Sequence, residues 1–393
     1  MIPRTLEKKL RESAKQYPVV LITGPRQSGK TTLCRKIFQK KHYVSFENPD
    51  TREFAQNDPK GLLERHPEGA IFDEIQRVPA LLSYIQGIVD ERGENGLYIL
   101  TGSQNILLLK SVQQSLAGRV AILKLLPFSY QEAGLFVDEF SLDKVIYTGG
   151  FPRIFDQKLD PTEAMRNYVE SYLERDVRQI INVRNLSSFQ RFLKLCAGRV
   201  GQALNLSSIG NDTGITHTTA REWLSVLEAG YIVYLLPAYY RNFNKRIIKS
   251  PKLYFYDTGL AAYLLGIEEF QHVSRDPLRG GLFENFVVIE LVKYLLARGH
   301  QVPLYYFRDN LGNEIDLIWE RARKVIGIEI KAGQTINSDW FKGQEYLKKI
   351  MGNDVSALAL VYGGKESQKR AGVDIFSYRE VARLHHEFSN ITV

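Results

Sequence analysis

The chain has 393 residues, enough for two or three domains that each bury a core of their own. With 44% hydrophobic and 24% charged residues it has the composition of a soluble globular protein, which excludes long disordered tracts. The formal net charge of +8 permits a polyanionic partner without requiring one. Two cysteines are too few for a disulfide framework, and the longest nearly apolar run, at 231–240, falls short of the roughly 20 residues that span a bilayer. We therefore expect a cytoplasmic protein without membrane contacts.

The first predicted strand, Val19 to Thr23, leads into a glycine-rich loop and then a helix. Nine consecutive residues carry the spacing GxxxxGK[ST] in its strand–loop–helix setting. They are Gly24, Pro25, Arg26, Gln27, Ser28, Gly29, Lys30, Thr31 and Thr32. Glycines let backbone N–H groups curl around phosphate oxygens, and a helix N-terminus favours anions. We expect Lys30 to neutralise the β- and γ-phosphates of a nucleotide and Thr31 to offer its hydroxyl to Mg²⁺.

Two further predicted strands end in polar residues that suit hydrolysis of a nucleoside triphosphate. "GAIFDEIQRV" ends in Asp73, expected to hold the Mg²⁺ shell, and Glu74, expected to polarise the attacking water. "GLYILTGSQN" ends in Ser103 and Asn105, which are placed to reach the γ-phosphate or that water. Asn105 is equally suited to cap the helix that follows. Arg119, before the next strand, is either an arginine finger or a plain surface arginine.

Six segments of the chain together resemble a known family. They are "GPRQSGKTT", "FDEIQ", "LTGSQN", "LAGRV", "LPFSYQE" and "GGFPRI". They look like the bacterial and archaeal AAA-family ATPases that are fused to a C-terminal domain of unknown function, and the resemblance spans essentially the whole chain. It implies an α/β P-loop NTPase core at 1–150, with a parallel five-stranded sheet, ATP and Mg²⁺ as its ligands, and the nucleotide at the carboxyl edge of the strands.

The middle of the chain predicts a helical lid or connector at 151–185 and a winged-helix module at 186–265. The run "LSSIGNDTGITHTTAREWLSVLEAGYIVYLL" reads as helix, turn, helix and strand, with the recognition helix at 216–228. Basic residues interleaved with aromatic ones follow it and suit contact with nucleic acid. They are Arg241, Lys245, Arg246 and Lys249. A rigid adaptor with a solvated basic loop remains an equal alternative.

The last part, 266–393, carries three carboxylates and a lysine in a fixed order. Glu284 lies on a predicted helix, Asp316 on the second of three strands, and Glu329 and Lys331 share one face of the third. Converging buried carboxylates favour a divalent cation. The order resembles restriction-endonuclease-like (PD-(D/E)XK) nucleases, which implies Mg²⁺ or Mn²⁺ on Asp316 and Glu329, with Glu284 on the outer side of the metal. The alternative is a structural ion-pair network in which Lys331 neutralises Glu329.

The sequence therefore predicts an ATP-hydrolysing enzyme that couples its nucleotide state to a C-terminal module for binding or cleaving nucleic acid, DNA more than RNA. A homo-oligomer is compatible with an arginine finger that acts across subunits. The alternative is a nucleotide-dependent switch whose winged-helix and degenerate nuclease-like parts hold a protein partner, which the sequence does not identify.

Overall fold

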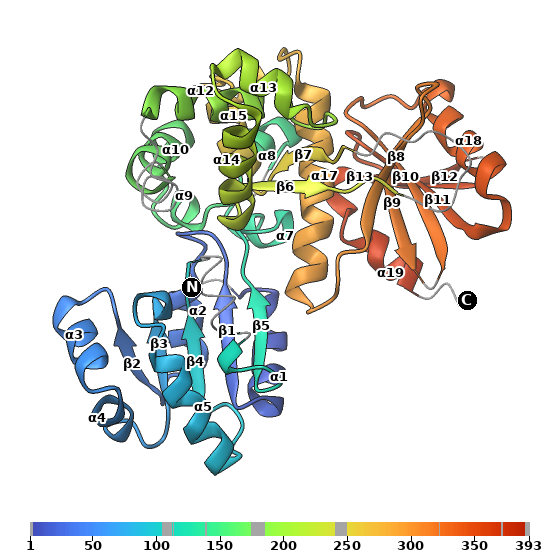
Figure 1. Ribbon diagram of the computed structural model, residues 1–393. Helices are drawn as coiled ribbons and strands as arrows, with labels where there is room; N and C mark the ends of the chain where they lie inside the picture. Colours follow the sequence, from blue (N-terminus) through green and yellow to red (C-terminus); the bar gives the residue numbers. More distant parts are fainter. Residues whose placement is uncertain are drawn as a thin grey trace. The chain divides into compact units, whose positions relative to one another are not determined.

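The structure is a computed structural model that describes residues 3–103, 112, 114–137, 140–173, 185–239, 250–321, 323–370 and 372–389. The chain forms two compact units, each described here by itself (Figure 1). The first comprises 1–128 together with 229–231 and 295–300, and the second comprises 129–228, 232–294 and 301–393. Among the described residues, no helix is long and apolar enough to cross a membrane.

A five-stranded parallel sheet forms the centre of the first unit (Figure 1). Its strands are β1 (Val19–Thr23), β2 (His42–Ser45), β3 (Ala70–Asp73), β4 (Tyr98–Thr101) and β5 (Val120–Lys124). They lie in the order β2–β3–β4–β1–β5, and every neighbouring pair is parallel. β1 is buried along its whole length, as its unbroken apolar run predicts for a strand between two neighbours. The predicted parallel five-stranded sheet is thus confirmed.

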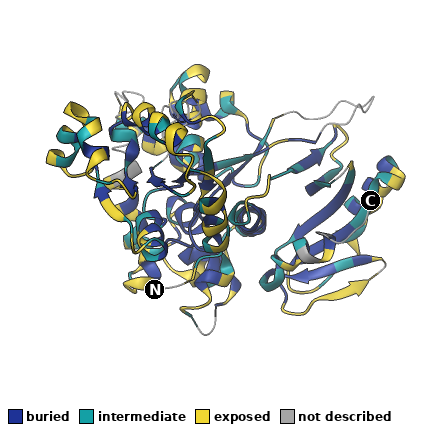
Figure 2. Cartoon of the chain, turned by 90° about the horizontal axis from the view of Figure 1, so that it is seen from below, coloured by how far each residue is buried: buried dark blue, intermediate teal, exposed yellow. Residues whose placement is uncertain are grey.

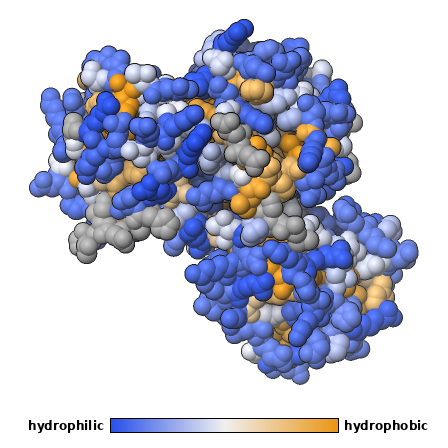
Figure 3. All heavy atoms as spheres, turned by 180° about the vertical axis from the view of Figure 1, so that it is seen from behind, coloured by the Kyte–Doolittle hydropathy of each residue, from blue (hydrophilic) through white to orange (hydrophobic). Residues whose placement is uncertain are grey.

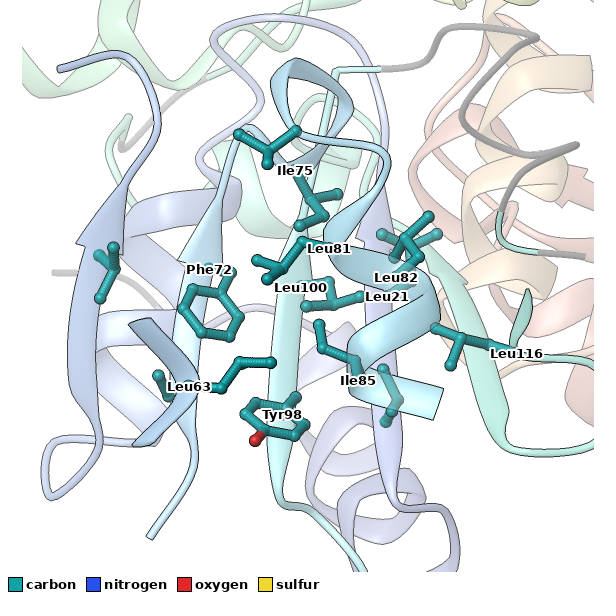
Figure 4. Close-up of a cluster of buried hydrophobic side chains, with 14 of the residues drawn as sticks. Leu21, Leu63, Phe72, Ile75, Leu81, Leu82, Ile85, Tyr98, Leu100 and Leu116 are labelled. Carbon is teal, nitrogen blue, oxygen red and sulfur yellow. The ribbon is translucent and has the colours of Figure 1, made fainter. Parts of the chain in front are cut away.

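Apolar side chains pack on both faces of this sheet because successive residues of a strand point to opposite sides. Leu21, Phe72 and Leu100 point into one core, which Figure 4 shows together with side chains of α5. Val20 and Ile22 point into the other core. The helical segments of this unit are α1 (Leu6–Gln16), α2 (Lys30–Ile37), α3 (Pro49–Asn57), α4 (Pro59–Glu64), η1 (Ile75–Arg77) and α5 (Leu81–Arg92).

Helices make up the first half of the second unit. The last residues of α14 and of α17 belong to the first unit. The helices are α7 (Tyr130–Ala133), α8 (Leu142–Thr148), α9 (Pro152–Asp156), α10 (Pro161–Tyr168), the π-helical η2 (Val169–Leu173), α12 (Leu186–Ala197), α13 (Leu206–Thr213), α14 (His217–Ala229), α15 (Thr258–Leu264), α16 (Phe270–Val273) and α17 (Arg279–Ala297). The predicted recognition helix at 216–228 corresponds to α14. β6 (Val233–Leu236) and β7 (Lys252–Phe255) form an antiparallel pair.

The second half of this unit is a mixed six-stranded sheet in the order β12–β13–β11–β10–β9–β8. Its strands are β8 (Leu304–Arg308), β9 (Glu314–Arg321), β10 (Lys324–Lys331), β11 (Val355–Tyr362), β12 (Gln368–Arg370) and β13 (Val373–Ser377). β8, β9 and β10 are antiparallel neighbours, whereas β11 runs parallel to β10 after a crossover through α18. The remaining helical segments are η3 (Ser338–Phe341), α18 (Lys342–Met351), η4 (Gly352–Asp354), η5 (Tyr378–Glu380) and α19 (Arg383–Ser389).

Burial follows this architecture. β1, β3, β4 and β7 are buried along their whole length, while many helices expose one face (Figure 2). On the face shown in Figure 3, hydrophilic residues cover most of the surface and apolar residues show in smaller groups. The candidate residues of the basic loop, Arg241, Lys245, Arg246 and Lys249, and also Asn105, lie outside the described residues.

Candidate functional site

The phosphate loop lies at the carboxyl end of β1, and all nine predicted residues lie in it or in the first turn of α2. Gly24 and Gly29 have φ values of 146° and 89°, which favour glycine. A Cβ atom on Gly24 would come within 2.1 Å of the carbonyl oxygen of Leu125. The Lys30 ammonium is buried inside the loop, where it donates to the carbonyls of Gly24 (3.0 Å) and Pro25 (2.8 Å). The loop carbonyls thus hold the Lys30 ammonium in place.

The electrostatics of Lys30 suit an anionic ligand. Burial lowers the pKa of Lys30 to about 8, although the nearby carboxylates of Glu74 and Asp73 act in the opposite direction. Phosphate oxygens in the loop would favour the charged ammonium again, because an opposite charge within a few ångströms stabilises the ionised form. Binding of a nucleotide and protonation of Lys30 are therefore linked.

Arg4 supports the loop from the segment before α1, and sequence reasoning missed it. Its guanidinium donates to the carbonyls of Ser28 (2.9 Å) and Leu126 (2.6 Å). It also lies 4.7 Å from the centre of the Phe128 ring. No motif marks this arginine, because its contacts are far away in sequence.

Asp73, at the end of β3, accepts hydrogen bonds from three hydroxyl groups. Thr31 Oγ1 lies 3.1 and 3.0 Å from its two oxygens. Thr101 donates to Oδ1, and the Tyr43 hydroxyl donates to Oδ2 at 2.7 Å. Burial, followed by the contact with Asp73, raises the pKa of Tyr43 to about 12, so this hydroxyl stays protonated. The adjacent oxygens of Thr31 and Asp73 fit Mg²⁺, a hard cation that prefers oxygen ligands.

Glu74, Gln76 and Ser103 form a polar triangle beside Asp73. Glu74 adopts a left-handed backbone conformation, with φ 58°, as the chain turns from β3 into η1. Its carboxylate accepts from Ser103 Oγ at 3.2 Å and from the Gln76 side chain, which also donates to Ser103 at 3.0 Å. The structure therefore brings the predicted Glu74 and Ser103 together and adds Gln76, which the motif "FDEIQ" contains.

Arg119 is not brought to this site within the chain. It precedes β5, and its carbonyl accepts from the backbone N–H of Val19 at the amino end of β1. The phosphate loop follows the opposite, carboxyl end of β1. The Arg119 guanidinium pairs with Asp90 on α5. Since the strands are parallel, Arg119 lies at the amino ends of the strands, whereas the phosphate loop lies at their carboxyl ends.

A second polar cluster lies in the second unit. It contains four carboxylates, Glu284 on α17, Glu314 and Asp316 on β9 and Glu329 on β10, and two lysines, Lys252 on β7 and Lys331 on β10. Lys331 Nζ lies between Asp316 Oδ2 (3.0 Å) and Glu329 Oε1 (2.7 Å). Asp316 Oδ2 also accepts from the backbone N–H of Ile330 at 2.8 Å.

Lys252 is the part of this cluster that sequence reasoning missed. Its side chain is 2% exposed, and its Nζ lies 2.7 Å from Glu284 Oε1 and 2.5 Å from Glu314 Oε1. The Tyr254 hydroxyl donates to the same oxygen of Glu284 at 2.6 Å. Lys252 and Tyr254 are two residues apart on β7 and so share one face of the strand. This spacing was the sequence signal that could have placed both side chains in the cluster.

The cluster is a network of ion pairs in its present form. Burial raises the pKa of Glu284 and of Glu329, and the neighbouring Asp316 adds to both shifts. Burial acts to lower the pKa of Lys252 and Lys331, but their carboxylate neighbours outweigh it and leave both raised. Glu329 Oε2 is buried without a hydrogen-bond partner.

The metal assignment to Asp316, Glu329 and Glu284 stays a prediction. Within the described ranges, no three carboxylate, histidine or cysteine side chains are grouped in a way that holds a metal ion. The ammonium groups of Lys252 and Lys331 pair with one oxygen each of Glu284, Asp316 and Glu329. The structure thus gathers the four predicted residues, Glu284, Asp316, Glu329 and Lys331, in one cluster, in which the three carboxylates are paired with Lys252 or Lys331.

The fold and the phosphate site of the first unit define a P-loop ATPase of the AAA type, and residues 16–134 match a family model described as "AAA domain". Residues 139–271 and 279–381 match two models, each described as a domain of unknown function (DUF8612 and DUF4143). The match to the AAA domain implies a nucleotide ligand, typically with Mg²⁺.

Sequence similarity to related proteins extends over most of the chain. An uncharacterized protein of Mycobacterium tuberculosis is 31% identical over 362 residues, which cover 91% of this chain and 79% of that protein. The chain belongs to the same family as this mycobacterial protein. An uncharacterized protein of Methanocaldococcus jannaschii is 24% identical, covering 91% of this chain and 84% of that protein. Among solved structures, the Walker-type ATPase PABY2304 of Pyrococcus abyssi is 15% identical with a TM-score of 0.46, covering 67% of this chain and 96% of that one.

Proposed function

We propose that the protein couples ATP hydrolysis in its first unit to a nucleic-acid-binding, nuclease-like module in its second unit. The observation that carries the second half is the gathering of Asp316, Glu329 and Lys331 on β9 and β10, with Glu284 on the preceding helix α17. This order of helix, three antiparallel strands, crossover helix and parallel strand resembles the PD-(D/E)XK nucleases.

The residues of the ATP site have separable tasks. Lys30 binds the β- and γ-phosphates, and Thr31 and Asp73 hold the cation. When bound, Mg²⁺ supplies neutralisation of the phosphate charge. Glu74 orients the water that attacks the γ-phosphate, and its own position is fixed by hydrogen bonds from Ser103 and Gln76. The Glu74 carboxylate also acts on Lys30, where it opposes the lowering of the pKa by burial, so the two charges lie near each other.

We propose that the second unit binds nucleic acid. The experiment below decides whether it also cleaves nucleic acid. A divalent cation would have to compete with Lys252 and Lys331 for the carboxylates of this cluster. The formal net charge of +8 and the basic sequence between β6 and β7 favour a polyanion. We expect binding to weaken with salt, because contacts to phosphates release counterions.

The deciding experiment measures binding and cleavage of single- and double-stranded DNA and RNA, with Mg²⁺ or Mn²⁺ and with or without ATP. We expect salt-dependent DNA binding whose affinity changes when ATP is added. Lys30→Ala should abolish ATP hydrolysis and the ATP effect while leaving ATP-free binding intact. If cleavage occurs, Asp316→Ala and Lys331→Ala should remove it. Absence of binding to every nucleic acid would refute the proposal.

A second candidate is a nucleotide-dependent switch whose second unit holds a protein partner. The observation that favours it is the pairing of Lys252 and Lys331 with the carboxylates, which suits a domain that kept this arrangement for stability. This candidate predicts intact ATP hydrolysis together with neither binding nor cleavage of nucleic acid in the same panel of substrates.

A further inference from the structure

Tyr43, on the edge strand β2, reaches the ATP site from outside every sequence motif. Its hydroxyl donates to Asp73 Oδ2 at 2.7 Å, a shorter contact than either of those from Thr31 to Asp73. Tyr43 is paired with Ile71 across β2 and β3, so its side chain extends two residues along the sheet to reach Asp73. This reach requires the ring to lean toward the carboxyl edge, where the phosphate loop lies.

The ring of Tyr43 is held in this direction by the helix that follows the phosphate loop. The Arg35 guanidinium lies 4.8 Å from the centre of the ring. Arg35 and Thr31 are four residues apart on α2, so they share one face of the helix. Through Thr31, that face contacts the Asp73 carboxylate. Through Arg35, it contacts the ring of Tyr43, whose hydroxyl donates to the same carboxylate.

The donors to Asp73 differ in whether the P-loop pattern also assigns them to the cation. Thr31 is the hydroxyl that this pattern assigns to Mg²⁺, so its oxygen would be shared between the cation and the hydrogen bond to Asp73. Thr101 donates to Oδ1 and Tyr43 to Oδ2, and neither belongs to the P-loop. The Tyr43 hydroxyl is therefore a donor to Oδ2 that the P-loop pattern does not assign to the cation.

We propose that Tyr43 is a positioning residue of the ATP site, which orients the Asp73 carboxylate for the divalent cation through a hydroxyl that the cation would not engage. The proposal rests on the assignment of Asp73 to the cation. The hydrogen bond of a neutral hydroxyl to a buried carboxylate is charge-assisted, which makes it stronger than an ordinary one and directional. The alternative is that Tyr43 merely fastens the edge strand β2 to β3.

The test uses Tyr43→Phe in the full chain, because this change keeps the ring and its contact with Arg35 and removes one oxygen. Mn²⁺ affinity is measured by electron paramagnetic resonance in the presence of a non-hydrolysable ATP analogue, and affinity for the analogue is measured separately without a divalent cation. We expect Mn²⁺ to bind at least about tenfold more weakly, as the loss of one hydrogen bond to a charged group implies. The cation-free affinity and the thermal midpoint should not change.

Two further variants make the outcome decisive. Tyr84→Phe is the matched control, since Tyr84 lies on α5 of the same unit with a similar exposure, 39% against 36% for Tyr43. It should match the wild type throughout. Unchanged Mn²⁺ affinity in Tyr43→Phe, or an equal loss of cation-free affinity or of thermal stability, overturns the positioning role. Asp73→Asn should weaken Mn²⁺ binding more than Tyr43→Phe does; if it leaves the affinity unchanged, the assignment of the cation to Asp73 fails as well.

Discussion

Lys252→Met removes the most deeply buried charge of the second cluster while keeping a side chain of similar length. The substitution leaves Glu284 and Glu314 without the ammonium that lies 2.7 and 2.5 Å from them. Removing one partner of a buried ion pair costs about 3–5 kcal/mol, because the other charge remains buried. Glu314 is 28% exposed and Tyr254 still donates to Glu284, so we expect the lower end, about 3 kcal/mol.

Tryptophan fluorescence isolates this effect because all three tryptophans, Trp223, Trp319 and Trp340, belong to the second unit. Urea unfolding followed by this signal should shift to a lower midpoint in Lys252→Met. The double variant Lys252→Met with Glu284→Gln should recover part of the loss, since it no longer buries an unpaired carboxylate. Lys369→Met is the control, because Lys369 is 68% exposed in its pair with Asp374. A midpoint equal to that of this control would refute the reasoning.

Three other predictions concern separate parts of the chain. Nucleotide affinity should fall as the pH rises above about 8, by up to about tenfold per pH unit, because free Lys30 then loses the proton that bound phosphate retains; titration with a fluorescent nucleotide from pH 7 to 9.5 should show a level affinity below about pH 8 and a decline above it, and an affinity that stays level to pH 9.5 would contradict this linkage. Gly149→Ala should lower the urea midpoint of the second unit, since its Cβ would lie 2.1 Å from Asp257 Oδ1, whereas Gly266→Ala, also at positive φ but with no atom within 4 Å, should cost less. Arg119→Ala should leave nucleotide affinity unchanged, and a large loss would place Arg119 at the phosphate loop after all.

The ATP site was predictable from the sequence because its chemistry is encoded in short stretches. The loop from Gly24 to Thr32 needs glycine at fixed places for its backbone, and this spacing is visible without a structure. Asp73 and Ser103 follow apolar runs, and parallel strands bring such ends to one edge of the sheet. The parallel five-stranded sheet then follows from the resemblance to AAA-family ATPases, whereas the order of its strands comes from the structure.

The residues that sequence reasoning missed are those whose role depends on contacts distant in the chain. Tyr43 reaches Asp73 across 30 positions, and Arg4 reaches Leu126 across 122. Neither belongs to a spacing that recurs among nucleotide-binding proteins. Lys252 belongs to no sequence motif either, although its side chain is 2% exposed and paired with two carboxylates. A lysine within an apolar strand was the sign that it had a buried partner.

The position of Lys252 also bears on how the second unit is organised. Lys252 and Tyr254 lie in the region 139–271, whereas Glu284 and Glu314, which they contact, lie in the region 279–381. These two regions match separate families of unknown function, yet they belong to one compact unit. A fragment that starts at 279 would keep the carboxylates and lose the ammonium and hydroxyl that satisfy them, and uncompensated buried charge is strongly destabilising. We therefore expect the two regions to fold together, so that whatever activity the second unit has belongs to both.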